Sequence, residues 1–460
     1  MEDSSEQKKN IEISVLKGEK LFNVNTPFII NLFAPETKEQ EENRVSADLI
    51  CVIDISGSMQ GEKIDQVKQS LNILVDMMDP KDRIALVLFD QQASILYDLN
   101  YLDKNNKEKV KNLIKNIDAR GGTNIASGLE IAVDILKKEK KNPKYNESRS
   151  SSIILLSDGC DNYSNDVVLA EKLKSLTKGE GLSFTLNTFG YGYDHDPKIM
   201  NKLANLRDGS FFLVEDYNKV GEYFVSVLGG CISMISKKAE VEVKLLNEKC
   251  KIVKIFGVNN LYSYELNDLV FKNQMLQFIT GKEYTFVLEI FIDESSVKPG
   301  DKLMEVKFIY EDILSKQEIK LSTLYKYELK DLKFTKANEE YIRSQTYDVL
   351  DQVLKLNEEN KTEEARKLLN GMKDWLEKNY KGENKSYLED IKKSEQIFDY
   401  GFNARRGVTC TISMVNQNIS KRMGSNNNAY TNSVQMRLQD NYRKNYTKSQ
   451  KGNNNQNNFI

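Results

Sequence analysis

The chain has 460 residues, enough for about two to four domains. Its 66 Lys and Arg residues nearly balance its 68 Asp and Glu residues, which argues against a nucleic-acid-binding protein or one held on an anionic membrane. One histidine and five widely spaced cysteines without a CxxC pair argue against a His-based catalytic triad, a zinc site and a disulfide framework. We therefore expect a cytoplasmic protein without membrane insertion, because we also find neither a secretion signal nor an apolar run of the roughly 20 residues that span a bilayer.

Two β segments flank the middle of the chain. After a polar, flexible N-terminus over 1–10, the stretches IEISVL and PFIINLFAP predict β structure within 11–46. Residues 238–330 alternate apolar and polar side chains, as in AEVEVKLL and LMEVKFIYE, which is typical of an antiparallel sheet with one exposed face. We expect the two segments to pair into a β-sandwich-like domain, with the residues between them inserted into it.

Residues 47–236 show a different pattern, in which short apolar runs alternate with amphipathic helices. Apolar residues recur at three- and four-residue steps after the first run, as one face of a helix requires. Continuous apolar strands between such helices predict an α/β domain with a Rossmann-like, doubly wound, mainly parallel sheet. The predicted strands are LICVI (49–53), IALVLF (84–89), IILL (153–156), FTLNTF (184–189) and FFLV (211–214).

The C-terminal part returns to a helical pattern. Residues 338–400 predict a helical hairpin or bundle, because their apolar residues form stripes at helical spacing. Residues 401–445 contain the apolar stretch RGVTCTISMVNQNI, which we expect to dock on these helices or on the β region. Residues 446–460 are rich in Asn and bury little, so we expect a disordered tail.

Oxygen-bearing side chains follow the predicted strands of the α/β domain. The sequence DISGSMQG places Asp54, Ser56 and Ser58 at alternate positions directly after LICVI. Thr123 lies in GGTNIASGL before a predicted helix, and in IILLSDG (153–159) a predicted buried strand ends at Asp158. In an open α/β sheet, ligands bind beyond the carboxyl ends of the strands. Two carboxylates and three hydroxyls on one rim suit a hard cation, which takes oxygen ligands.

This constellation resembles the von Willebrand factor type A (VWFA) domain and its metal-ion-dependent adhesion site (MIDAS). The family pattern is D-x-S-x-S, then a Thr and then an Asp, so the resemblance implies metal binding by Asp54, Ser56, Ser58, Thr123 and Asp158. The expected ion is Mg²⁺, or else Mn²⁺ or Ca²⁺. DLICVIDISGSMQGEKI, LLSDGCDN and RGVTCTISMVNQNISKRMG resemble the branch in which the A domain is followed by a β-rich Vwaint domain.

The resemblance implies a non-enzymatic protein-binding module. In the family, an Asp or Glu carboxylate of a partner protein completes the metal's shell. An alternative is a scaffold that recruits substrates to a ubiquitin ligase, because some relatives carry a RING finger that this chain lacks. A metal-dependent hydrolase is disfavoured, since phosphotransfer on such a rim usually needs a second acid where this chain has Ser56. A degenerate site that has lost its metal stays open.

Other polar residues near these loops have simpler explanations. Asp161 and Asn162 follow Asp158 and could lie at the rim, but turn formation explains them well. Asp194, His195 and Asp196 resemble ligands of a transition metal. We favour the interpretation that Asp196, which precedes Pro197, caps a helix.

Overall fold

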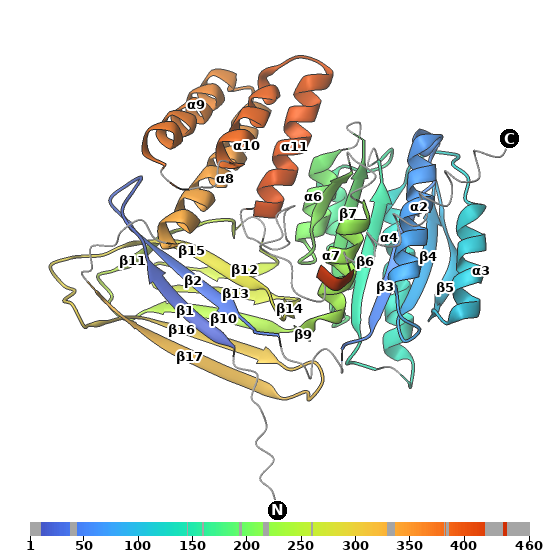
Figure 1. Ribbon diagram of the computed structural model, residues 1–460, viewed down its shortest axis with the longest axis horizontal. Coiled ribbons are helices and arrows are strands. Elements are labelled where there is room, and N and C mark those ends of the chain that lie inside the picture. Colours follow the sequence, from blue (N-terminus) through green and yellow to red (C-terminus); the bar gives the residue numbers. More distant parts are fainter. Residues whose placement is uncertain are drawn as a thin grey trace, which may run out of the picture.

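The computed structural model describes most of the chain, and three units lie side by side in it (Figure 1). They are an α/β unit, a β-sandwich and a group of C-terminal helices. The sequence predictions for 1–10 and 446–460 lie outside the described residues. The described residues are 11–36, 44–144, 146–158, 161–192, 196–214, 220–258, 261–328, 336–380, 382, 386–418 and 436–438.

The α/β unit is built on a six-stranded sheet in the order β5-β4-β3-β6-β7-β8. Its strands are β3 (Ala47–Asp54), β4 (Arg83–Phe89), β5 (Ala93–Tyr101), β6 (Ser150–Ser157), β7 (Thr185–Tyr191) and β8 (Phe211–Val214). All neighbouring pairs are parallel except β4 and β5. The doubly wound, mainly parallel sheet predicted from the sequence is confirmed. The sequence does not predict β5, because this edge strand is partly exposed and lacks a continuous apolar run.

Helices cover both faces of this sheet, which explains the continuous apolar strands. Ile50 and Val52 of β3 pack with α4, α5 and α6, whereas Leu49, Cys51 and Ile53 pack with α2, α3 and α7. All five of these side chains are fully buried. The helices are α2 (Glu62–Met77), α3 (Lys104–Lys115), α4 (Ile125–Lys141), α5 (Asp166–Thr177), α6 (Pro197–Asn205) and α7 (Val220–Ile232).

The β-sandwich takes strands from both sides of the α/β unit in the sequence. One sheet has the order β1-β2-β15-β11 and the other β12-β13-β10-β16-β17. The N-terminal strand β2 pairs antiparallel with β15, so Phe33 lies opposite Glu283. The strands are β1 (Glu12–Lys17), β2 (Thr26–Phe33), β10 (Ala239–Leu245), β11 (Lys251–Ile255), β12 (Ser263–Leu266), β13 (Val270–Met275), β15 (Glu283–Phe291), β16 (Lys302–Glu311) and β17 (Glu318–Lys326), with a small pair β9 (Met234–Ser236) and β14 (Phe278–Ile279).

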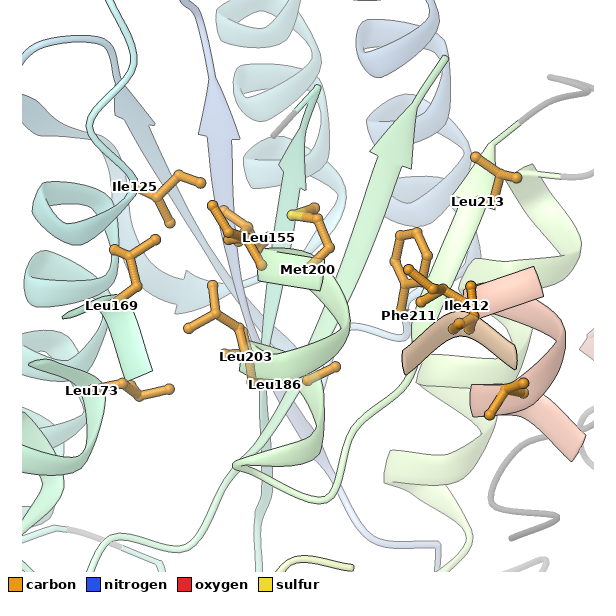
Figure 2. Close-up of a cluster of buried hydrophobic side chains, with 14 of the residues drawn as sticks. Ile125, Leu155, Leu169, Leu173, Leu186, Met200, Leu203, Phe211, Leu213 and Ile412 are labelled. Atoms are coloured by element: carbon orange, nitrogen blue, oxygen red, sulfur yellow. The ribbon is translucent and has the colours of Figure 1, made fainter. Parts of the chain in front are cut away.

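The C-terminal helices contact both of the other units. They are α8 (Lys336–Glu358), α9 (Thr362–Asn379), α10 (Ser386–Ser394), the short 3-10 helix η4 (Glu395–Phe398) and α11 (Phe402–Asn418). Helix α8 packs on β2 and β15, and α11 packs on α8, α10 and η4 and also on α6 and β8. One hydrophobic cluster therefore continues from the α/β unit into these helices, and Figure 2 shows Ile412 of α11 beside Phe211 of β8. Among the described residues, no helix combines the length and the apolar composition that a membrane span requires.

Candidate metal centre

Two neighbouring strands bring the predicted carboxylates together. Asp54 is the last residue of β3, and Asp158 directly follows β6, which pairs with β3 in parallel. Both carboxylates are buried, with 0% and 2% of the residue exposed. Ser56 and Ser58 lie in the loop from β3 to α2, and Ser58 belongs to a short 3-10 helix at Gly57–Met59. The site therefore stands at the carboxyl edge of the sheet.

Hydrogen bonds join four of the five predicted residues into a chain. The Ser56 amide donates to Asp54 Oδ1 at 2.8 Å. The hydroxyls of Ser56 and Ser58 lie 3.0 Å apart. The Ser58 hydroxyl donates to Asp158 Oδ1, also at 3.0 Å. These contacts bring the oxygens of Asp54, Ser56, Ser58 and Asp158 to one place.

Thr123 reaches the same edge through its loop. The Gly57 amide donates to the Gly121 carbonyl at 3.0 Å, which packs the loop before α4 against the loop after β3. Thr123 itself is buried, with 3% exposed. Within the described residues no hydrogen bond joins the Thr123 hydroxyl to the other four side chains, so its placement rests on the loop contact.

Asp161 and Asn162 hold the Thr123 loop in place. Asn162 Oδ1 accepts from the Thr123 amide at 2.7 Å, and the Asn162 amide donates to the Thr123 carbonyl at 2.9 Å. Asp161 Oδ2 accepts from the Ile125 amide at 2.7 Å, at the first residue of α4. Asp161 Oδ1 accepts from the Ser164 amide in its own turn. The two residues therefore form a turn, as expected, and also position the neighbouring loop.

Of the DHDP sequence at 194–197, the structure describes Asp196 and Pro197. Asp196 is the N-cap of α6, and its carboxylate accepts from the amides of Lys198 and Ile199 at 2.9 and 3.2 Å. Pro197 follows as the first helical residue, so the capping interpretation is confirmed. Asp194 and His195 lie outside the described residues.

The electrostatics of the site favour a bound cation. Burial raises the pKa of Asp54 to about 6, against the hydrogen bonds from Ser157 and Ser56 that lower it, and the neighbouring charge of Asp158 raises it further. Two buried carboxylates at one edge repel each other, and an opposite charge beside them favours their ionised forms. A cationic group already rests there, because Lys63 Nζ lies 2.8 Å from Asp158 Oδ2.

Two residues of the site are not predicted from the sequence. The Ser157 hydroxyl donates to Asp54 Oδ2 at 2.5 Å, and its position at the end of a buried apolar strand is the signal that could have identified it. Lys63 is the second residue of α2. It carries no such signal, because lysines occur on most helices of this chain.

The donor set fits a hard divalent cation. It offers carboxylate and hydroxyl oxygens alone, which are ligands of the kind that Mg²⁺ prefers. Among the described residues, no three His, Cys, Asp or Glu side chains come together in a way that could hold a metal. A metal held by the described residues of this edge therefore depends on the hydroxyls as well as on Asp54 and Asp158.

Comparisons with known proteins identify the α/β unit. The family model of the von Willebrand factor type A domain matches residues 48–225. This part of the chain is a VWA domain.

A structure described as von Willebrand factor type A from Catenulispora acidiphila has a TM-score of 0.64 at 15% identity, covering 90% of this chain and 98% of that one. The ArnB paralog VWA2 from Sulfolobus acidocaldarius has a TM-score of 0.53 at 18% identity, with the same coverage. At these identities the two structures support the fold alone.

Curated relatives match over different extents. An uncharacterized protein of Synechocystis sp. is 24% identical over 324 residues, which are 68% of this chain and 73% of the relative. The inter-alpha-trypsin inhibitor heavy chain H4 of Bos taurus is 28% identical over 184 residues, which are 39% of this chain and 19% of the relative. The alignment thus spans about a fifth of that heavy chain. A VWA domain is generally a non-enzymatic protein–protein interaction module, and these matches indicate no enzymatic family.

Proposed function

We propose that the VWA domain binds one divalent cation, with Mg²⁺ as the expected ion, and uses it to bind an acidic residue of a partner protein. The proposed ligands, direct or through water, are Asp54, Ser56, Ser58, Thr123 and Asp158. The observation that carries the proposal is the hydrogen-bonded chain from Asp54 through Ser56 and Ser58 to Asp158. We also propose that the β-sandwich corresponds to the Vwaint-like region of related proteins.

The side chains account for binding without catalysis. Asp54 and Asp158 supply two negative charges, and the hydroxyls are neutral, so a bound divalent cation would stay electrophilic towards a further carboxylate. The buried setting of Asp54 strengthens its interaction with a cation, because charges interact more strongly away from water. Ser157 and the Ser56 amide hold the Asp54 carboxylate in a fixed orientation. None of these residues has to act as an acid, base or nucleophile.

Titration calorimetry of the full chain with MgCl₂ tests the metal site. Asp54→Asn keeps the shape of the side chain and removes its charge, so we expect it to abolish measurable Mg²⁺ binding. The matched control is Asp65→Asn, which removes an exposed carboxylate from α2 and should keep the wild-type affinity. Unchanged affinity in the Asp54 variant would refute the proposed site.

Affinity capture from native lysate tests the partner. The same bait is used with Mg²⁺, with EDTA, and as the Asp54→Asn variant. Partners held through the metal should be lost in both of the latter conditions. A partner that binds equally in all three conditions does not use the metal, and a set made only of such partners would contradict the proposed binding mode.

A further inference from the structure

We propose that Lys63 is a tethered counter-cation, which holds the Asp158 carboxylate in the metal-free VWA domain and competes with the divalent cation for it. This inference rests on the proposed metal site and adds a residue that sets its affinity. Lys63 would thereby make metal binding weaker and stabilise the domain without metal.

The contact between Lys63 and Asp158 is well defined. Lys63 Nζ lies 2.8 Å from Asp158 Oδ2, and the side chains are 23% and 3% exposed. The Ser58 hydroxyl takes the other oxygen, Oδ1. A Cβ placed on Gly192 would lie 3.6 Å from Lys63 Cε, so the stem of the lysine runs along the loop after β7. The ammonium group is therefore held over the site.

Within the described residues, no other positively charged side chain pairs with the carboxylates of the site. Among these residues, Asp158 forms an ion pair only with Lys63, and Asp54 forms none. Arg120 is exposed and faces Asp90, with Nε 3.7 Å from Asp90 Oδ2. Among the side chains that the structure describes, Lys63 thus supplies the single neutralising charge for two buried carboxylates of the proposed donor set.

A divalent cation would change this balance. It brings two positive charges to the same carboxylates, and like charges at close range repel. The short hydrogen bond from Lys63 to Asp158 is of the strong, charge-assisted kind, and the incoming ion has to weaken or break it. The free energy of that contact is then subtracted from the free energy of metal binding.

The test compares Mg²⁺ affinities of the full chain by titration calorimetry for the wild type and for Lys63→Met, which keeps an unbranched stem and removes the charge. We expect the variant to bind Mg²⁺ about tenfold more tightly, which is about 1.4 kcal/mol. Lys68→Met is the matched control, because Lys68 lies on the same helix with its Nζ 3.9 Å from Asp118. In EDTA, Lys63→Met should melt below the wild type, and saturating Mg²⁺ should remove that deficit.

Each outcome decides between the two proposals. Competition is supported if Lys63→Met is the one protein of the three that binds Mg²⁺, or if it binds Mg²⁺ more tightly than both the wild type and Lys68→Met. Equal affinity in the wild type and Lys63→Met, weaker binding by Lys63→Met, or the same gain in both lysine variants overturns the inference and leaves the metal site standing. Absence of Mg²⁺ binding in the wild type and in both variants overturns the proposed metal site and this inference with it.

Discussion

Asn162 connects two loops of the candidate metal centre by two hydrogen bonds to the backbone of Thr123, one from its side chain and one from its amide. Its side chain accepts from the Thr123 amide, and its amide donates to the Thr123 carbonyl. In metal sites, residues that orient the ligands typically change metal affinity by about 10- to 100-fold when they are replaced. We expect Asn162→Ala to weaken Mg²⁺ binding about tenfold, at the low end of this range, because one of the two hydrogen bonds remains. Calorimetry of the full chain measures this.

The matched control for Asn162→Ala is Asn165→Ala in the same loop. Asn165 is the N-cap of α5 and accepts from the amides of Val167 and Val168. Its loss should lower stability by about 1 kcal/mol, as for other N-caps, and leave Mg²⁺ affinity unchanged. If both variants lost affinity equally, the effect would come from general loosening of the loop rather than from Thr123.

At the residue scale, the sequence predicts the parts of the candidate site that follow from local patterns. Asp54 ends an apolar strand, Ser56 and Ser58 lie in the loop after it, and Asp158 directly follows another such strand, so the strand rule alone places them at one edge. Lys63 is different, because its contact with Asp158 joins residues 95 positions apart in the sequence. No local pattern encodes such a pair, and only the packing of α2 against the sheet reveals it.

At the element scale, burial decides which strands the sequence predicts. The strand β3 is buried along its whole length and gives a continuous apolar run. The edge strand β5 contacts one neighbour, β4, and exposes Ile95 and Tyr101, so its residues are mixed and its signal is weak. An edge strand of this kind forms because it pairs with a neighbouring strand, and its own hydrophobic pattern contributes little.

Lys237, between β9 and β10, allows a test of the junction between the VWA domain and the sandwich. Its ammonium donates to the carbonyls of Glu147 and Arg149 at 2.6 and 3.1 Å. Burial, with a smaller effect of Lys316, lowers the pKa of Lys237 from 10.5 to about 8. Between these two values the unfolded chain binds more protons than the folded one, so this group's contribution to stability rises with pH.

We therefore expect the wild type to gain stability relative to Lys237→Met as the pH rises from about 7.5 to 9.5. The gain should be on the order of 1 kcal/mol, after allowance for the partial exposure of the side chain. Urea denaturation of both proteins at both pH values measures it. Lys238→Met removes the same charge from an exposed neighbour and is the control. A stability difference between wild type and Lys237→Met that stays constant with pH would contradict the prediction.

At the scale of the whole molecule, contacts between distant segments fix how the units sit together. The strand β2 pairs with β15 across the whole VWA domain in the sequence, and α11 returns from the C-terminal helices to the edge of that domain. The alternation patterns predict each unit separately. They do not predict that α11 packs on α6 and β8, because an amphipathic helix can bury its apolar face on any complementary surface.

Asn416 of α11 is the polar anchor of this packing. It is 2% exposed, and its Nδ2 donates to Asn201 Oδ1 and Asn205 Oδ1 at 2.6 and 2.9 Å, while its Oδ1 accepts from the Phe211 amide at 3.2 Å. Asn416→Ala removes these three hydrogen bonds, each with a net contribution of about 1 kcal/mol, so we expect a loss of about 2–3 kcal/mol in the free energy of unfolding. Asn418→Ala is the control on the same helix, because the Asn418 side chain donates to the Met414 carbonyl one turn earlier and makes no hydrogen bond to the described residues of the VWA domain. Urea denaturation of both variants measures the difference. Equal losses would show that α11 is held by its apolar face, and that the asparagine contacts with α6 and β8 add no stability of their own.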